Sequence, residues 1–327
     1  MEAELARCVA CFHPGATGVT GAAKLSGGAS QETWSFDIVH PDGDIGAILR
    51  RAPKGFGASP TRAAGLDAEA RLMQLAHDAG LPSPRVLHVL APSDELGAGF
   101  IMQRIEGETI ARKILRDAQF AEARPILAHQ LGKVAAGIHG LPREKLPELR
   151  TSTAPKEIAE LAREYRGFGR PRPVFELALS WLRAHDPGAP HHVTLVHGDF
   201  RHGNLIIGPD GLRAVLDWEL AHLGDPMEDL GWVCVNSWRF GEIDKPVGGF
   251  GSREELFAGY EAAGRRVDPG RVRFWEVLGT LRWGVMCCGM MQRFRTGPDH
   301  SMERAMIGRR ASETEIDLLR LLAPRGH

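Results

Sequence analysis

The chain has 327 residues, of which 43% are hydrophobic and 25% charged, and its formal net charge is −1. These are ordinary values for a globular protein, and a charge so close to zero argues against bulk attraction to nucleic acid or anionic membranes. The length exceeds one average domain, so we expect two lobes.

Neither a membrane span nor a secretion signal is evident in the sequence. No apolar run is long enough to cross a bilayer, and the start Met1-Glu-Ala-Glu lacks the basic residues of a signal peptide. We therefore expect a cytoplasmic protein. Five cysteines are present, and the pair Cys8-x-x-Cys11 has no second Cys or His pair at ligand spacing. Buried thiols are favoured over a zinc or redox site.

The first hundred residues alternate between polar and apolar positions and predict a small sheet with one helix. A short amphipathic N-terminal segment precedes two strands, 19–25 and 33–38, which are separated by Ser26-Gly27-Gly28-Ala29-Ser30. An ordinary hairpin turn would explain this glycine pair. Backbone N–H groups in such a turn can also approach a phosphate closely, since no side chains intervene.

A third strand is predicted at 46–53, and a helix at 62–79 follows it. Strand alternation puts Arg50 on one face of the sheet and Arg51 on the other, where we expect a solvated side chain. The helix carries two acidic residues that could pair with Arg50, Glu69 and its neighbour Asp67, and a surface position for Glu69 is the alternative. Two more strands are expected at 86–90 and 99–107.

Helices dominate after residue 107. The core helix of this half is predicted at 120–139, and two shorter helices follow at 155–166 and 173–185. Further helices are expected to open near Glu228 and to span 254–263, 272–294 and 300–322.

Between these helices lies the most informative stretch of the chain, 193–219, which predicts strand, loop, strand, turn, strand. Polar side chains gather at the strand ends: His197 and Asp199 follow the first strand, Asn204 precedes the second, and Asp217 follows the third. Two carboxylates and an amide held on a hairpin are what phosphoryl transfer requires. A polar hairpin with a capping Asp is the alternative.

The motif His-Gly-Asp-x-x-x-x-Asn, followed by Asp217-Trp-Glu, resembles that of the aminoglycoside phosphotransferase and choline kinase superfamily. The resemblance covers roughly residues 20 to 320. Together with Leu-Arg-Arg-x-Pro and Leu223-Gly-Asp-Pro it is most similar to the branch that includes kinase-like domains fused to some acyl-CoA dehydrogenases. Related sequences commonly have Asn where this chain has Gln31.

This resemblance implies a two-lobed α+β protein-kinase-like fold that binds ATP and Mg²⁺. The small antiparallel N-lobe (1–105) would have one helix, and the larger C-lobe (106–327) would be mainly helical. Asp199 would be the catalytic base, and Asn204 and Asp217 would hold the metal. Nucleotide contacts would come from the glycine turn (Gly27, Gly28 and Ser30), Arg50 with Glu69, and a hinge near Gln103 and Ile105. Asp229 would brace the catalytic loop, or simply carry a charge at a helix start.

The acceptor is less clearly indicated. The helix predicted at 272–294 is rich in Trp, Met and Arg, whereas a site for a polycationic aminoglycoside should be rich in carboxylates. We expect most of its apolar residues to be core. The leading hypothesis is a kinase that phosphorylates a hydroxyl of a small metabolite, such as a hydroxyacyl or other apolar or anionic compound. An antibiotic kinase and a nucleotide-binding pseudokinase are the alternatives, and the oligomeric state is not predicted.

Overall fold

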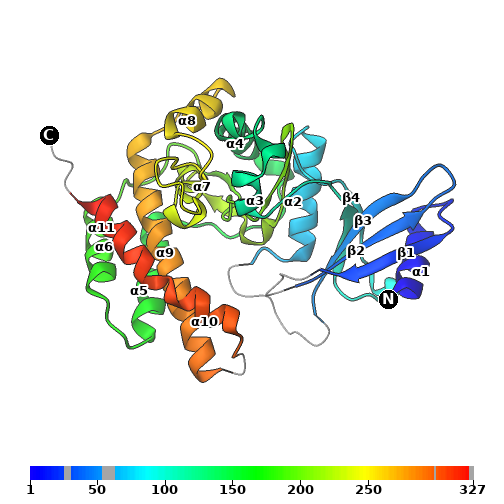
Figure 1. Ribbon diagram of the computed structural model, residues 1–327, viewed down its shortest axis with the longest axis horizontal. Coiled ribbons are helices and arrows are strands. Elements are labelled where there is room, and N and C mark those ends of the chain that lie inside the picture. The colour runs from blue at the N-terminus through cyan, green and yellow to red at the C-terminus, as the bar shows by residue number, and fades with distance from the viewer. Residues whose placement is uncertain (26–30, 54–62, 298–299, 324–327) are drawn as a thin grey trace.

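The computed structural model describes residues 1–25, 31–53, 63–297 and 300–323. A β-rich N-terminal lobe sits beside a larger, mainly helical C-terminal lobe (Figure 1), which confirms the predicted kinase-like α+β fold. The described part of the chain has no helix that is both long enough and apolar enough to cross a membrane.

The N-lobe is built on an antiparallel five-stranded sheet with the strand order β1-β2-β3-β5-β4. Its strands are β1 (Gly18–Lys24), β2 (Glu32–Val39), β3 (Ile45–Arg51), β4 (Val86–Val89) and β5 (Gly99–Gln103). Each face of the sheet packs on a different core because successive side chains of a strand point to opposite sides. Ile48 belongs to the large core shared with the C-lobe, whereas Leu49 belongs to a separate outer core.

Helix α1 (Glu2–Phe12) accounts for the amphipathic N-terminal segment and covers the outer face of this sheet. Leu5, Cys8 and Val9 are its buried residues, and they pack with Phe36, Ile38 and Leu49. Helix α2 (Leu66–Asp78) lies on the other face, toward the C-lobe (Figure 1). It begins later than predicted, because the segment before it is extended and Ala64 N donates to Glu219 O (2.7 Å).

The expectation that Arg51 is solvated is wrong. Arg51 is buried, and its guanidinium donates to Glu32 Oε2 (3.0 Å) and to the carbonyl of Leu96 (3.2 Å). Glu32 stands directly opposite Arg51 in the β2–β3 ladder, so the two form a cross-strand ion pair.

The C-lobe contains helices α3 to α11. Their bounds are α3 (Ala111–Arg116), α4 (Arg124–Ile138), α5 (Ala154–Gly167), α6 (Pro173–Ala184), α7 (Met227–Val233), α8 (Arg253–Ala262), α9 (Pro269–Thr296), α10 (Met302–Arg309) and α11 (Ala311–Leu322). The single helix predicted at 300–322 is therefore two, broken at Arg310. The break lets α10 and α11 each pack on the long helix α9, and α11 also contacts α6.

Two short antiparallel ladders carry the motif region of the C-lobe. Strands β7 (Leu205–Gly208) and β8 (Gly211–Val215) form a hairpin, and β6 (Thr194–Val196) pairs with β9 (His222–Gly224). A 3-10 turn (Trp218–Leu220) connects β8 to β9. These ladders bring the loop after β6 and the residues after β8 to the side of the C-lobe that faces the sheet.

Candidate active site

A cavity of about 660 Å³ lies between the lobes and collects five of the ten predicted site residues. Arg50 enters from β3 and Glu69 from α2. Asp199, Asn204 and Asp217 enter from the C-lobe ladders. Residues that lie 167 positions apart, such as Arg50 and Asp217, are thereby brought into contact.

The β7–β8 hairpin sets the distance between Asn204 and Asp217. Leu205 pairs with Val215 in the hairpin, and just beyond its open end Leu216 N donates to Asn204 O (2.8 Å). Asp217 follows directly in a left-handed conformation, with φ 65° and ψ 66°. Asp is among the residues that tolerate this conformation. The reversal of the backbone turns its carboxylate toward the cavity, where the side chain is partly exposed.

Asp199 is held by three side-chain donors. Its Oδ1 accepts from Trp232 Nε1 (2.8 Å) and Arg201 Nε (2.9 Å), and its Oδ2 accepts from Asn204 Nδ2 (2.6 Å). The carboxylate is almost buried but still lines the cavity. Its orientation is therefore fixed before any ligand binds.

The loop that carries Asp199 is held from behind by Asp229. The Asp229 carboxylate accepts from the backbone N–H groups of His197 (2.8 Å) and Gly198 (2.9 Å), and from His139 Nε2 (2.9 Å). Burial opposes ionisation, but the hydrogen bond and charge of His139 hold the pKa of Asp229 below its usual value. Asp229 is thus a brace of the loop and not merely a charge at a helix start.

His197 is a structural residue of the same loop. Its Nε2 faces Leu216 O (3.1 Å), and its Nδ1 accepts from Asp199 N (3.2 Å). Complete burial lowers the pKa of His197, so the ring is neutral, and both nitrogens are engaged with backbone. This geometry leaves neither nitrogen for proton transfer.

Arg50 joins the lobes electrostatically. Its Nε lies 3.1 Å from Glu69 Oε1, and its Nη2 donates to Asp217 Oδ1. Glu219 Oε2 lies 3.8 Å from the same nitrogen, farther away than Asp217 Oδ1. Arg50 and Glu69 therefore form the pair expected from the sequence, and Asp217 is an additional partner that the sequence did not suggest.

Glu69 ionises less readily than an ordinary carboxyl. Its side chain is fully buried, and this desolvation raises its pKa to about 7, although the charge of Arg50 offsets part of the effect. A second nearby carboxylate, Asp217, also disfavours the ionised form. The charge on Glu69 consequently changes near neutral pH.

The chemistry of Asn204 and Asp217 fits a magnesium ion. Because the Asn204 amide nitrogen is committed to Asp199 O (2.9 Å) and Oδ2, the atom that Asn204 can offer to a cation is its amide oxygen. Asp217 contributes a carboxylate that faces the cavity. Mg²⁺ in phosphate-transfer sites is commonly held by one or two protein oxygen ligands, with waters and substrate phosphates completing the shell.

The other predicted nucleotide contacts are not tested by the structure. Gly27, Gly28 and Ser30 lie outside the described residues. Gln103 ends β5 and Ile105 follows it, at the point where the chain leaves the sheet. Neither belongs to the residues that line the cavity, although Met102 and Thr109 on either side of them do.

The wall of the cavity beyond Asp199 is aromatic, apolar and cationic. Trp232, Trp238 and Trp283 form an aromatic cluster, in which Trp238 meets Trp232 edge-to-face (ring centroids 5.3 Å apart) and is tilted against Trp283 (4.9 Å). The same wall is completed by residues of α9 and α10, namely Arg282, Met286, Met290 and Ile307. The expectation that the apolar residues of 272–294 are mostly core holds for the first half of this segment. Its second half contributes Trp283, Met286 and Met290 to the cavity wall.

Two arginines in this wall are fixed by surrounding groups. Arg282 donates to Glu228 Oε1 (2.8 Å), and its guanidinium carbon lies 5.5 Å from the centre of the Trp232 ring. The guanidinium carbon of Arg201 lies 4.5 Å from the centre of the Trp238 ring. Sequence reasoning missed Trp232 and Arg201 as partners of Asp199. The available signals were the position of Trp232 three residues after Asp229 and the position of Arg201 in the loop between Asp199 and Asn204.

Comparison with known proteins agrees with this arrangement. The model of a family described as the phosphotransferase enzyme family matches residues 21–275. Acyl-CoA dehydrogenase family member 10 of Mus musculus is 30% identical over 195 residues, which are 58% of this chain but 18% of that protein. The chain thus spans well under half the length of the curated relatives it matches.

Solved structures share the fold over nearly the whole chain. A Ralstonia eutropha protein assigned to the aminoglycoside phosphotransferases aligns with a TM-score of 0.73 and 21% identity, covering 98% of this chain and 97% of the other. A spectinomycin phosphotransferase in complex with ADP and spectinomycin aligns with a TM-score of 0.65 and 14% identity, covering 98% and 99%.

Proposed function

The chain belongs to the phosphotransferase enzyme family, and we propose that it transfers the γ-phosphoryl group of ATP to a hydroxyl of a small metabolite. The observation that carries this proposal is the arrangement of Asp199, Asn204 and Asp217 around one cavity, with Arg50 reaching in from the opposite lobe. The chain also shares its fold with a spectinomycin phosphotransferase that was solved in complex with ADP, which supports a nucleotide as the ligand.

Positioning and charge neutralisation account for most of catalysis in this chemistry. Asp199 would orient the acceptor hydroxyl and accept its proton, since its carboxylate is fixed by three donors and lines the cavity. Asn204 and Asp217 would hold Mg²⁺, which neutralises phosphate charge when bound. Arg50 would contact the phosphates through Nη2 while Glu69 keeps Nε in place.

The far wall supports an acceptor with an apolar body and an anionic or polar end. Arg201 and Arg282 supply positive charge beside the aromatic cluster. The rings of Trp238 and Trp283 supply apolar surface to this wall. A hydroxyacyl compound has both features, whereas a polycationic aminoglycoside would have to place positive charge next to the two arginines.

The decisive experiment measures ATP consumption by the purified protein over hydroxyacyl-CoAs, amino alcohols, sugars and antibiotics, with mass spectrometry of the product. We expect turnover with a hydroxyacyl or related anionic acceptor. Asp199→Asn should abolish turnover but leave ATP·Mg binding nearly intact, because an amide keeps the shape but cannot accept the proton. Turnover confined to antibiotics would favour the antibiotic kinase, and nucleotide binding without any turnover would favour the pseudokinase.

A further inference from the structure

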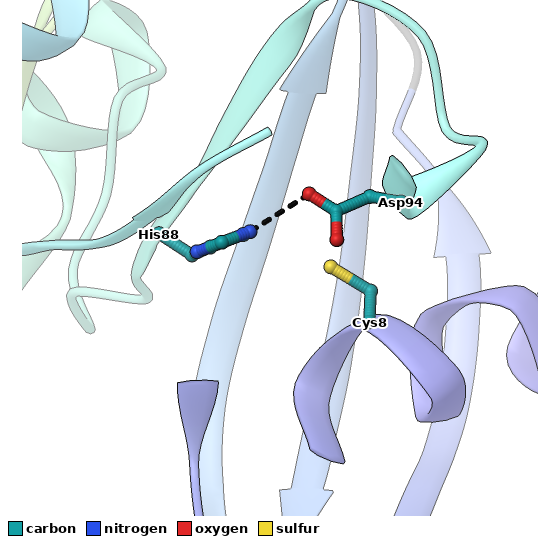
Figure 2. Close-up of side chains that lie close together, drawn as sticks. All are labelled: Cys8, His88 and Asp94. Atoms are coloured by element: carbon teal, nitrogen blue, oxygen red, sulfur yellow. Dashed lines mark hydrogen bonds and ion pairs between the residues drawn. The ribbon is translucent and has the colours of Figure 1, made fainter. Parts of the chain in front are cut away.

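We propose that Cys8, His88 and Asp94 form a binding site for a zinc-like divalent cation on the outer side of the N-lobe. Figure 2 shows the three side chains converging from different elements, helix α1, strand β4 and the 3-10 turn Pro92–Asp94. One potential ligand atom from each residue lies within 4.8 Å of the other two. No other group of three or more His, Cys, Asp or Glu residues in the described chain meets this criterion.

The carboxylate and the imidazole are oriented by their neighbours. Asp94 Oδ2 accepts from Ala91 N (2.7 Å) and lies 2.8 Å from His88 Nε2. Phe12 stacks on the His88 ring, with the ring centroids 4.7 Å apart and the planes 7° from parallel. The contacts of Asp94 with Ala91 and of His88 with Phe12 orient the two side chains, as outer-shell partners do in metal sites, and a bound cation would replace the His88–Asp94 hydrogen bond.

The donor set favours zinc. A thiolate sulfur, an imidazole nitrogen and a carboxylate oxygen are the three ligand types that Zn²⁺ binds in proteins, and solvent can occupy a fourth tetrahedral position. Hard cations such as Mg²⁺ would avoid the sulfur.

A catalytic thiol is a poor alternative. Burial and the adjacent Asp94 carboxylate raise the pKa of Cys8 to about 12, whereas a nucleophilic cysteine needs a lowered pKa. Asp94 carries the hydrogen bonds to both Cys8 and His88, so the imidazole is not placed as the base of the thiol. A bound divalent cation would displace the proton of the Cys8 thiol to solvent and would compensate the negative charges of the thiolate and of Asp94.

The site would join α1 to the β4 edge of the sheet and the turn after it by linking Cys8 to His88 and Asp94, which lie 80 and 86 positions farther along the chain. Leu5 and Val9 of α1 already pack on the outer core, and a metal bridge would add a polar attachment at one end of this contact. The expected role is stabilisation of the N-lobe. None of the three residues lines the cavity between the lobes, so the inference is independent of the proposed function.

The test uses the full chain, stripped of metal and supplied with excess Mg²⁺ so that oxygen-only sites are occupied. Zn²⁺ titration by calorimetry should give one ion per chain, and Co²⁺ should produce a thiolate-to-cobalt charge-transfer band. A zinc concentration a hundred times Kd should raise Tm by roughly 4 °C if the whole chain unfolds cooperatively. Cys8→Ser should remove the band, and His88→Gln should weaken binding more than about tenfold.

Cys11→Ser is the matched control, because Cys11 lies on the same helix but is exposed. It should leave the stoichiometry and the band unchanged. His88→Gln, at a partly exposed side chain, keeps the test valid if replacement of the buried Cys8 impairs folding. The proposal is overturned if no stoichiometric Zn²⁺ binds, if the band survives in Cys8→Ser, or if Cys11→Ser abolishes it.

Discussion

Replacement of Arg50 tests the electrostatic contact between the lobes most directly. In the structure Nε is paired with Glu69 and Nη2 with Asp217. A charge-assisted hydrogen bond to phosphate contributes about 1.5–3 kcal/mol, or roughly ten- to a hundredfold in Kd. Because Nη2 must exchange Asp217 for a phosphate oxygen, the net gain lies near the lower limit. Arg50→Ala should therefore weaken nucleotide binding by about tenfold or somewhat more.

Arg50→Lys should retain part of the affinity, because the ammonium keeps the charge but cannot reach Glu69 and a phosphate as a planar fork does. Calorimetry with a non-hydrolysable ATP analogue and Mg²⁺ measures this without knowledge of the acceptor. Arg51→Ala is unsuitable as a control, because Arg51 is buried with Glu32. Arg166→Ala, which breaks an exposed pair with Glu176, should change nothing. Equal affinities for Arg50→Ala and the wild type would refute the reasoning.

Three other outcomes are expected. Asp217→Ala should raise the Mg²⁺ concentration needed for nucleotide binding, since it removes an anionic oxygen ligand, and an unchanged affinity for ATP·Mg in calorimetry would contradict that role. The Kd of ATP·Mg should rise as pH falls through about 7, where Glu69 takes up a proton and loses its charge attraction for Arg50. This dependence should flatten in Glu69→Gln, and an identical profile in the variant would disprove the link. Asp229→Asn should lower the free energy of unfolding, measured in urea, by about 1–3 kcal/mol. The side-chain NH₂ of Asn would replace one carboxylate oxygen, and it cannot accept the hydrogen bond from the backbone N–H of His197 or Gly198.

The proximity of Asp199, Asn204 and Asp217 was predictable because the polar residues and the strand pattern coincide in one stretch. One short apolar run ends shortly before Asp199, the next begins directly after Asn204, and the hairpin that follows places Asp217 beside them. The spacing of five positions between Asp199 and Asn204 is set by the loop itself. Local signals of this kind need no knowledge of how distant elements pack.

Features that depend on packing between distant segments were missed. Alternation correctly separated Arg50 from Arg51, but only the β2–β3 register reveals that Glu32 stands opposite Arg51 and buries it. The hydrogen bond from Trp232 to Asp199 crosses from α7 to the loop after β6. The break at Arg310 likewise reflects the packing of two helices on α9, which periodicity within 300–322 does not show.

The two-sided burial of the N-lobe sheet has a practical consequence for shortened versions of the protein. A chain trimmed to start at residue 21 would lose α1 and the first part of β1, and so the cover of Phe36, Ile38 and Leu49. The side of the sheet that faces the C-lobe would keep its packing, yet a continuous apolar surface would face water on the reverse side. Such surfaces drive self-association, so the trimmed chain should aggregate during expression even though every residue that lines the cavity between the lobes is still present.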